Sequence, residues 1–532
     1  MGDPNNPDVL HLMAAVVSQA GDIEQAIELM KKAVAIRPDY IDAHGNLGQT
    51  LMSLGRQEEA VVHFQKILEL EPNYIEAHGD LGNALAGLGR FDEAMVHFQK
   101  IVEDRPEIFQ AQTNMGNVLM VLGRAEEAIT HYHKVTEIAP NNSAGHVMLG
   151  DAYRQVERLD EAIECYQRAI EVEPYNFEAH YNLGTAYMGL GRYGEAQAEF
   201  NEGIRINHGG PWWGAATFGD GEGAFAAMTP PASTPTVSAF KLSDTADQLE
   251  YLINKGKIDP SFDRMVRRYR SVVDEIHQDK GGDAVTELTP DQFGRIATFF
   301  DRVVHIGESG AIEGETVNPD LDFKKIEDSY LSSPVQVTTF DDFLTPTALK
   351  ALQDYCMEST FFFDYLGPGY VGSRISCGFN HDLLYQIVED LRARFPRVIA
   401  DHELSNMWVY RHRNQCDGVR AHTDEEAVTF NFWITPDEAN LNPDGSGLIV
   451  YTKEQPLDWD WQRYNKLKHT PEVKQEIDDF LADADTVTMP HRENRALLFH
   501  SNLFHKSEPI NFKDGFENRR INITLLFGRR EA

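Results

Sequence analysis

The sequence predicts a multidomain protein in which an all-α solenoid of repeats is followed by a β-rich domain with supporting helices. Small residues recur with a fixed step over residues 7–208. Short apolar runs typical of β-strands are frequent in residues 333–532. The full length of 532 residues is also too great for a single hydrophobic core, so more than one domain is expected.

The repeat array occupies residues 7–208, where alanines recur at positions 26, 60, 94, 128, 162 and 196, a step of 34 residues. Gly48 and Ala60 allow the two helices of one unit to approach closely, while Gly55 ends the first helix and Pro72 ends the second. This pattern resembles the tetratricopeptide repeat in six copies. The resemblance implies a superhelix with a concave groove lined by the first helix of each pair.

The groove positions predict a protein or peptide partner. In superhelical relatives, asparagines at the sixth position of each repeat hold an extended peptide by its backbone. Asp80 and Met148 interrupt that series here. The side chains predicted to contact a peptide are Asn46, Asn83, Asn114, Asn117 and Asn182.

Two segments connect the repeats to the β-rich domain. Residues 209–241 are rich in Gly, Pro and Ala, which predicts a linker. Residues 242–332 are predicted as a helical connecting region that caps the last repeat or braces the following domain. Residues 333–532 form the predicted β-rich domain, and its charged segment 453–495 is either a lid or a surface insertion.

His422 and Asp424 are candidate metal ligands. They precede β-type runs at 427–434, 448–452, 495–499 and 521–527, and residues i and i+2 of a strand share a face. Other His-x-Asp pairs, at 78/80 and 277/279, fall in helical stretches. Two histidines and one carboxylate suit an iron site with open positions. His500 and His505 are the rival third ligands from the residues alone.

Three motifs in order resemble the double-stranded β-helix (jelly-roll, cupin-like) oxygenases that use Fe(II) and 2-oxoglutarate, in their prolyl-4-hydroxylase-like branch. The motifs are Tyr410 followed by His422-Thr423-Asp424, then LLFHSNLFHKSEP (497–509), then RRINITLLFG (519–528). The resemblance covers roughly residues 335–530. It implies that His505 is the third iron ligand and that Arg520 binds the far carboxylate of 2-oxoglutarate, with O2 as the oxidant.

An arginine suits that carboxylate because its guanidinium donates two parallel hydrogen bonds. The family pattern of Arg and then Thr four residues later favours Arg520 with Thr524 over Arg519, which we expect to be a solvated cation at the strand start. Trp433 stands where relatives often present a tyrosine to the co-substrate. Asn431 shares its face and either supplies the missing hydrogen bond or is a core amide. Tyr410 is a co-substrate contact or a core residue.

Composition narrows the class of protein further. The net charge of −36 repels phosphate backbones, which disfavours nucleic acid as a partner. No apolar run is long enough to span a membrane, and the first residues lack the features of a signal peptide. The four scattered cysteines fit a reducing cytoplasm.

The sequence therefore predicts a dioxygenase that hydroxylates a protein or peptide recruited by the repeats, with proline as the target only by analogy. The carboxylate of Asp424 favours hydroxylation, because related halogenases lack it. One alternative is a small-metabolite hydroxylase whose repeats serve oligomerisation or docking. Another is a non-catalytic scaffold built on the repeats.

Overall fold

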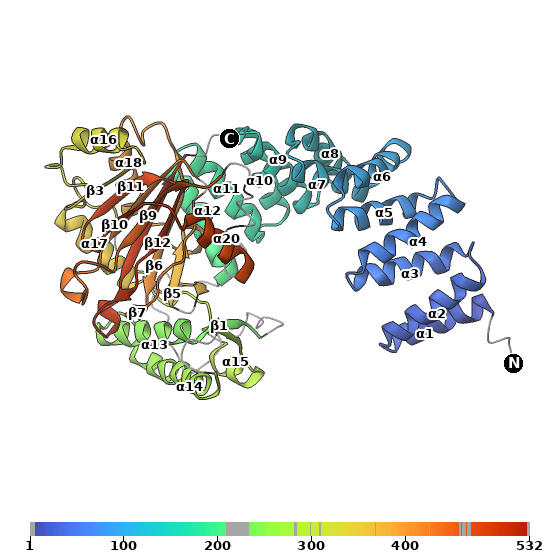
Figure 1. Ribbon diagram of the computed structural model, residues 1–532, viewed down its shortest axis with the longest axis horizontal. Coiled ribbons are helices and arrows are strands. Elements are labelled where there is room, and N and C mark those ends of the chain that lie inside the picture. The colour runs from blue at the N-terminus through green and yellow to red at the C-terminus, as the bar shows by residue number, and fades with distance from the viewer. Residues whose placement is uncertain are drawn as a thin grey trace. The chain divides into compact units, whose positions relative to one another are not determined.

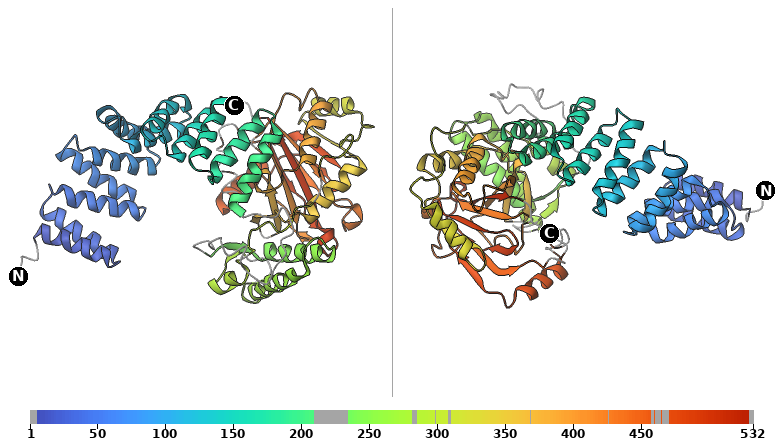
Figure 2. Two further views of the ribbon diagram at one scale, coloured as in Figure 1. Left: turned by 180° about the vertical axis from the view of Figure 1, so that it is seen from behind. Right: turned by 90° about the horizontal axis from the view of Figure 1, so that it is seen from above.

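The computed structural model describes residues 6–208, 234–280, 285–297, 299–307, 310–367, 369–424, 426–456, 459, 464 and 470–528. The predicted linker therefore lies outside the described residues as far as residue 233. The chain divides into two compact units, Met1–Ala179 and His180–Ala532, which are described separately below (Figures 1 and 2).

The first unit is an all-helical solenoid of consecutive helix pairs, coloured blue to teal in Figure 1. Its helices are α1 (Pro7–Gln19), α2 (Ile23–Ile36), α3 (Ile41–Ser53), α4 (Gln57–Leu70), α5 (Ile75–Gly87), α6 (Phe91–Asp104), α7 (Phe109–Val121), α8 (Ala125–Ile138), α9 (Ser143–Gln155) and α10 (Leu159–Val172). Helix α11 (Phe177–Gly189) crosses the boundary, and α12 (Tyr193–His208) belongs to the second unit. The last predicted repeat therefore packs with the C-terminal region.

From the α3–α4 pair onward, each helix pair of the array has a glycine of its first helix packed against an aromatic ring of its second helix. A Cβ atom at Gly82 of α5 would approach the Phe98 ring of α6 to 2.5 Å, and Gly48 stands in the same relation to Phe64. The same pair recurs between α7 and α8 as Gly116 with Tyr132. The absent side chain thus makes the hole that the ring of the second helix fills.

The second unit contains a seven-stranded antiparallel sheet with the order β3-β11-β8-β14-β6-β5-β4. Its strands are β3 (Val337–Phe340), β4 (Asp364–Gly367), β5 (Tyr370–Arg374), β6 (Leu404–His412), β8 (Val428–Trp433), β11 (Ala496–His500) and β14 (Ile521–Phe527). A three-stranded sheet has the order β10-β9-β12, from β9 (Leu448–Glu454), β10 (Thr486–Met489) and β12 (Leu503–Ser507). The short strands β7 (Gln415–Cys416) and β13 (Ile510–Asn511) pair with each other.

The two larger sheets share one apolar cluster. Trp433, Leu497 and Phe499 of the seven-stranded sheet pack with residues of the three-stranded sheet, among them Leu448 and Leu503. On its other face, the seven-stranded sheet carries Phe430 and Phe432, which contact aromatic rings from residues 340–395. Helix α20 (Pro471–Leu481), from the charged insertion, packs on the three-stranded sheet through a cluster that includes Ile477 and Phe504.

Helices surround these sheets. They are α13 (Ala239–Asn254), α14 (Asp263–Lys280), α15 (Pro290–Ile296), α16 (Phe323–Ser332), α17 (Pro346–Glu358) and α18 (Asp382–Arg394). Residues 237–299 form a core of their own, and β1 (Thr236–Ser238) pairs there with β2 (Val285–Glu287). Regular structure begins before the expected residue 242, because the Ser238 hydroxyl accepts a hydrogen bond from the amide of Lys241 and caps α13.

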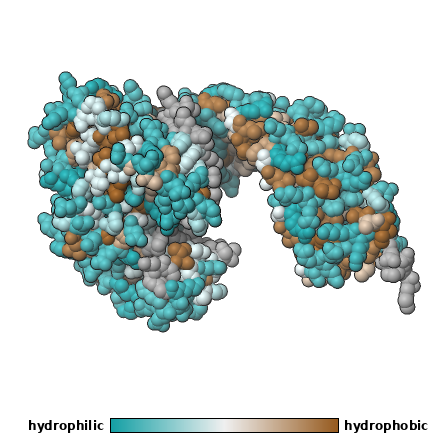
Figure 3. Space-filling model, viewed as in Figure 1, coloured by the Kyte–Doolittle hydropathy of each residue, from teal (hydrophilic) through white to brown (hydrophobic). Residues whose placement is uncertain are grey.

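The face of the molecule in Figure 3 is mostly hydrophilic, with hydrophobic residues in separate small patches, as the acidic composition leads one to expect. Among the described residues, no helix combines the length and the apolar character needed to span a membrane.

The glycine–aromatic pairs give a stability prediction. The Gly82→Ala variant is expected to be destabilised by about 1–3 kcal/mol, because its methyl group would overlap the Phe98 ring. Gly79→Ala on the same helix is the matched control, since its Cβ would lie an ordinary 3.7 Å from Ile101. That variant should be neutral or gain up to about 1 kcal/mol from helix propensity. Urea unfolding followed by circular dichroism compares the two, and equal free energies of unfolding would contradict the packing argument.

Candidate metal centre and anion pocket

His422, Asp424 and His505 meet at one point of the second unit. One potential ligand atom from each lies within 4.8 Å of the others, and no other such group of three occurs among the described residues. The Nε2 atom of His505 is 3.7 Å from Oδ2 of Asp424. Asp424 and His505 are buried, and His422 is half-buried. Two imidazoles and one carboxylate at this spacing can hold one divalent ion.

Backbone pairing brings these residues together although they are far apart in sequence. His422 and His505 face each other across an isolated antiparallel bridge, with N–O distances of 3.1 and 2.9 Å. The Asp424 amide donates to the carbonyl oxygen of Ser501 at 3.0 Å. The segment at 422–424 therefore lies beside β12 and the turn before it, which fixes all three side chains on one side.

The ring orientations of both histidines are set by backbone carbonyls. Nδ1 of His422 lies 2.8 Å from the carbonyl oxygen of Arg420, and Nδ1 of His505 lies 3.2 Å from that of Leu503. A carbonyl oxygen only accepts, so each Nδ1 carries the proton and Nε2 is the ligand atom. The Thr429 hydroxyl donates to Oδ2 of Asp424 at 2.8 Å and orients the carboxylate.

His500, the rival ligand, lies elsewhere. It is the last residue of β11 and pairs in register with Val428, while its amide donates to the Gln336 carbonyl oxygen. It is not part of the three-residue group. The structure thus gathers His505, and not His500, with His422 and Asp424.

A buried pocket opens beside this group. The strand registers place Tyr410 opposite Asn522, and Asn431 opposite Thr524, so that β6, β14 and β8 present these four side chains on one face. The lining also includes residues of the facing segments. The full lining is Trp408, Tyr410, His412, Val419, His422, Asp424, Asn431, Leu448, His505, Ser507, Asn522 and Thr524.

Arg520 lies behind this lining as a buried cation. It is 1% exposed, and no carboxylate pairs with it among the described residues. One guanidinium nitrogen is 3.5 Å from Nδ1 of His412, and another donates to the Gly447 carbonyl oxygen at 3.3 Å. The guanidinium carbon lies 5.5 Å from the centroid of the Trp433 ring. Burial lowers the pKa of Arg520 to about 10.

Several buried polar atoms around Arg520 lack a hydrogen-bond partner within the described part of the chain. They are Nε of Arg520, Nε2 of His412, Nε1 of Trp433 and the side-chain oxygens of Asn431 and Asn522. Burial, and then the charge of Arg520, hold the pKa of His412 well below its usual value, so this ring stays neutral. A buried cation among unused polar groups is the arrangement that a bound anion would complete.

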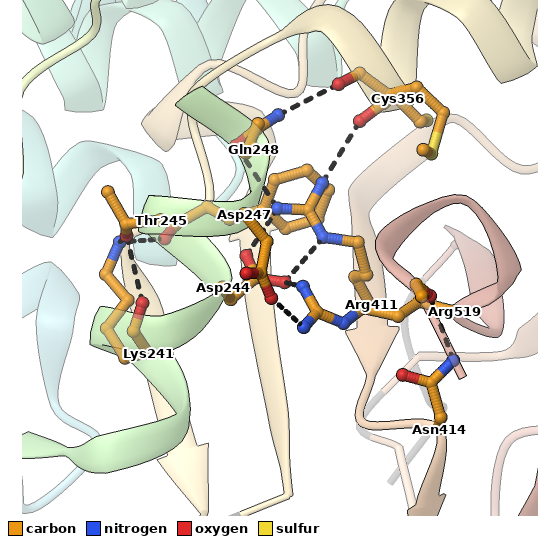
Figure 4. A network of polar contacts seen from close by, with 12 residues as sticks. Lys241, Asp244, Thr245, Asp247, Gln248, Cys356, Arg411, Asn414 and Arg519 are labelled. Atoms are coloured by element: carbon orange, nitrogen blue, oxygen red, sulfur yellow. Dashed lines mark hydrogen bonds and ion pairs between the residues drawn. The ribbon is translucent and has the colours of Figure 1, made fainter. Parts of the chain in front are cut away.

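Arg519 differs from the expectation of a solvated cation. It is 6% exposed and binds Asp244 and Asp247 of α13 (Figure 4). The physical reason is that α13 packs against this end of β14 and supplies the buried counter-charge. Arg519 and Arg520 are consecutive residues, yet within the described part of the chain only Arg519 pairs with a carboxylate.

His412 is a pocket residue that sequence reasoning missed. It lies two residues after Tyr410 on β6, so the period-two rule that linked His422 to Asp424 would have placed both on one face. Tyr410 is half-buried, and desolvation raises the pKa of its hydroxyl. Trp433 shares the face of Asn431, as expected, and packs in the apolar cluster near Arg520.

The asparagines predicted to bind a peptide already interact inside the repeat array. Nδ2 of Asn114 donates to Oδ1 of Asn83 at 2.7 Å, and Nδ2 of Asn46 lies 2.7 Å from Nε2 of His11. Oδ1 of Asn117 accepts from Tyr132 at 2.7 Å, and Asn182 is buried. Four of the five amides are therefore already engaged within the array, so they are not a row of independent donors.

Comparisons with known proteins identify the first region. Models described as tetratricopeptide repeats match residues 17–61, 51–115, 109–142 and 177–209, and a TPR repeat model matches residues 150–191. The prediction of tetratricopeptide repeats in the N-terminal region is confirmed. Repeats of this class generally bind protein or peptide partners. The comparison with curated proteins finds no match.

Similar solved structures cover about a third of the chain. MamA 41-end from Desulfovibrio magneticus RS-1 is 27% identical over 32% of this chain and 95% of its own, with a TM-score of 0.31. A MamA RS-1 double mutant is 27% identical over 32% of this chain and 94% of its own, with the same TM-score of 0.31. YrrB, described as a TPR protein with an unusual peptide-binding site, is 23% identical over 34% of this chain and 92% of its own, with a TM-score of 0.31.

The geometry predicts which histidine binds a metal. His505→Ala is expected to abolish high-affinity Co(II) binding, whereas His500→Ala should bind like the wild type, because only His505 contributes to the three-residue group. Visible absorption during anaerobic Co(II) titration measures this. Loss of binding in His500→Ala, or retention in His505→Ala, would contradict the assignment.

Proposed function

We propose that the second unit is an Fe(II)- and 2-oxoglutarate-dependent dioxygenase with a double-stranded β-helix fold, which hydroxylates a protein or peptide substrate. The observation that carries this proposal is the proximity of two features. One is the His422, Asp424 and His505 group in the pocket lining, and the other is the buried Arg520, which contacts the lining residue His412 and has no paired carboxylate among the described residues. Each feature alone could serve packing or stability. A dianion that chelates the metal at one end and binds Arg520 at the other would use both.

The fold assignment is supported by the sheet order. A seven-stranded antiparallel sheet and a three-stranded antiparallel sheet share the apolar cluster around Trp433, and the candidate ligands lie at one end of it. Closed or doubly layered antiparallel sheets of this kind enclose small-ligand cavities.

The donor set fits Fe(II). Two neutral imidazoles and one carboxylate would hold the ion on one side and leave its other positions open. When bound, Fe(II) and 2-oxoglutarate supply the oxidation of a substrate C–H bond to C–OH by O2, with conversion of 2-oxoglutarate to succinate and CO2. The protein's own part is to bind, orient and exclude water.

Each pocket residue has a role in that binding. Arg520 would form a bidentate pair with the far carboxylate of 2-oxoglutarate, which removes the cost of its buried charge. Asn431, Thr524 and Tyr410 offer polar groups on the same face. Trp433 and its apolar neighbours exclude water beneath the guanidinium, which strengthens the ion pair.

The repeats support a second candidate function, protein–protein interaction or scaffolding, because tetratricopeptide repeats are confirmed in the N-terminal region. In the dioxygenase proposal they recruit the substrate. A small-metabolite hydroxylase with repeats used for oligomerisation or docking is the remaining alternative, and the peptide experiment below separates the two.

Arg520→Gln tests the co-substrate assignment. Anaerobic Fe(II) and 2-oxoglutarate should give the wild type the visible charge-transfer band of a chelated ketoacid. The variant should need roughly 100-fold more 2-oxoglutarate, since a hydrogen-bonded ion pair is worth about 1.5–3 kcal/mol. It should also unfold at a higher temperature without ligand, because an unpaired buried charge is removed.

Arg495→Gln is the control, because Arg495 pairs with Asp341 outside the pocket lining. It should leave the affinity for 2-oxoglutarate unchanged. Absence of the band in folded, metal-loaded wild type would reject the co-substrate assignment and favour the scaffold.

Asn114→Ala and Asn117→Ala test substrate recruitment. If the repeats present a protein substrate, each should lower kcat/KM for that protein several-fold and leave its substrate-independent consumption of 2-oxoglutarate unchanged. Gln99→Ala, an exposed site on the second helix of a repeat, is the control. Equal kcat/KM for the protein in all variants would contradict recruitment by these asparagines, and turnover of a small metabolite but of no protein would favour the small-metabolite alternative.

A further inference from the structure

Helix α13 binds the residues that directly precede His412 and Arg520 in sequence. Asp244 of α13 is 1% exposed and binds two guanidinium groups at once. Arg411 donates from Nε to its Oδ1 at 3.0 Å and also contacts its second oxygen, while Nη1 of Arg519 donates to Oδ1 at 2.6 Å. Figure 4 shows both arginines converging on this carboxylate.

The two arginines come from neighbouring strands at the position where those strands meet the pocket. Arg411 directly precedes His412 on β6, and Arg519 directly precedes Arg520 at the start of β14. The His412 amide donates to the Arg520 carbonyl oxygen at 2.9 Å. Asp244 therefore ties together the two strand ends on either side of that hydrogen bond.

The cluster around Asp244 is balanced in charge, with the carboxylates of Asp244, Asp247 and Glu250 paired with Arg270, Arg411 and Arg519. Asp247 binds Arg519 and also Arg270, whose side chain is 44% exposed. Gln248 accepts from Arg411 at 3.2 Å and donates to the Ser359 carbonyl oxygen at 2.7 Å. The Arg411 guanidinium also lies 3.9 Å from the Phe362 ring centroid. Apart from Nε of Arg519, which has no hydrogen-bond partner among the described residues, these contacts hold the side chains of Arg411 and Arg519 in one arrangement.

We propose that Asp244 is a positioning residue for the anion pocket, which holds Arg520 and His412 in their binding geometry through Arg411 and Arg519. The helical region of α13 is then part of the co-substrate site, although none of its residues lines the pocket. A buried guanidinium can bind a carboxylate without reorganisation only if its backbone is fixed. The identity of the anion rests on the proposed function. The positioning of Arg520 and His412 by Asp244 does not depend on it.

The test compares Arg519→Gln with Arg270→Gln in the full-length chain. Arg519→Gln leaves Asp244 paired with Arg411, and Asp247 paired with Arg270, so the variant is expected to fold. Asp244→Asn is the stronger variant, but it leaves two buried cations without a partner. Arg270→Gln removes only the partly exposed ion pairs of Arg270 with Asp247 and Glu250 in the same cluster, and it serves as the matched control.

Arg519→Gln is expected to raise the Kd for 2-oxoglutarate about tenfold, measured from the charge-transfer band with anaerobic Fe(II), and to leave the Kd for the metal within about twofold. Amide hydrogen exchange at residues 408–412 and 520–524 should become faster. Arg270→Gln should match the wild type in both measurements, and Arg519→Lys should restore part of the affinity for 2-oxoglutarate.

Three results would overturn the inference. They are an unchanged Kd for 2-oxoglutarate in Arg519→Gln, an equal loss in Arg270→Gln, and unchanged exchange at both strand ends. If the wild type gives no band with 2-oxoglutarate, the proposed function fails and hydrogen exchange alone decides whether Asp244 positions the strand ends.

Discussion

The register of β14 between β6 and β8 is the constraint on which the pocket depends. One face of β14 places Asn522 opposite Tyr410 and Thr524 opposite Asn431. Arg520 directly precedes this strand in sequence. Strand side chains alternate between faces, so a slip by one residue would send the whole polar set to the opposite side of the sheet. The apolar residues Ile523 and Leu525, fully buried on that other face, make such a slip costly.

The two units are stabilised in different ways. In the repeats, each glycine–aromatic pair joins two helices that are adjacent in sequence, so stability accumulates repeat by repeat. In the second unit, buried ion pairs join residues that are distant in sequence, such as Asp244 with Arg519. A local change in the repeats therefore affects neighbouring helices, whereas a change at Asp244 affects strands hundreds of positions away in sequence.

Local patterns in the sequence predicted the repeats, the strand-rich region and the neighbouring positions of His422 and Asp424, because each depends on a period of 34 or two residues. Periodicity could not separate His500 from His505, since the turn between β11 and β12 decides which ring points inward. It also could not show that Arg519 is buried, because its counter-charge lies on α13. His412 was within reach of the same two-residue rule and was overlooked.

The position of β14 has a consequence for biosynthesis. This strand lies in the middle of the seven-stranded sheet, yet the ribosome makes it after both of its neighbours, β6 and β8. Until β14 emerges, those two strands expose unpaired backbone edges to each other and to other chains, a state that favours aggregation. During synthesis, a chaperone that covers the edges of β6 and β8 until β14 emerges would therefore raise the yield of folded protein.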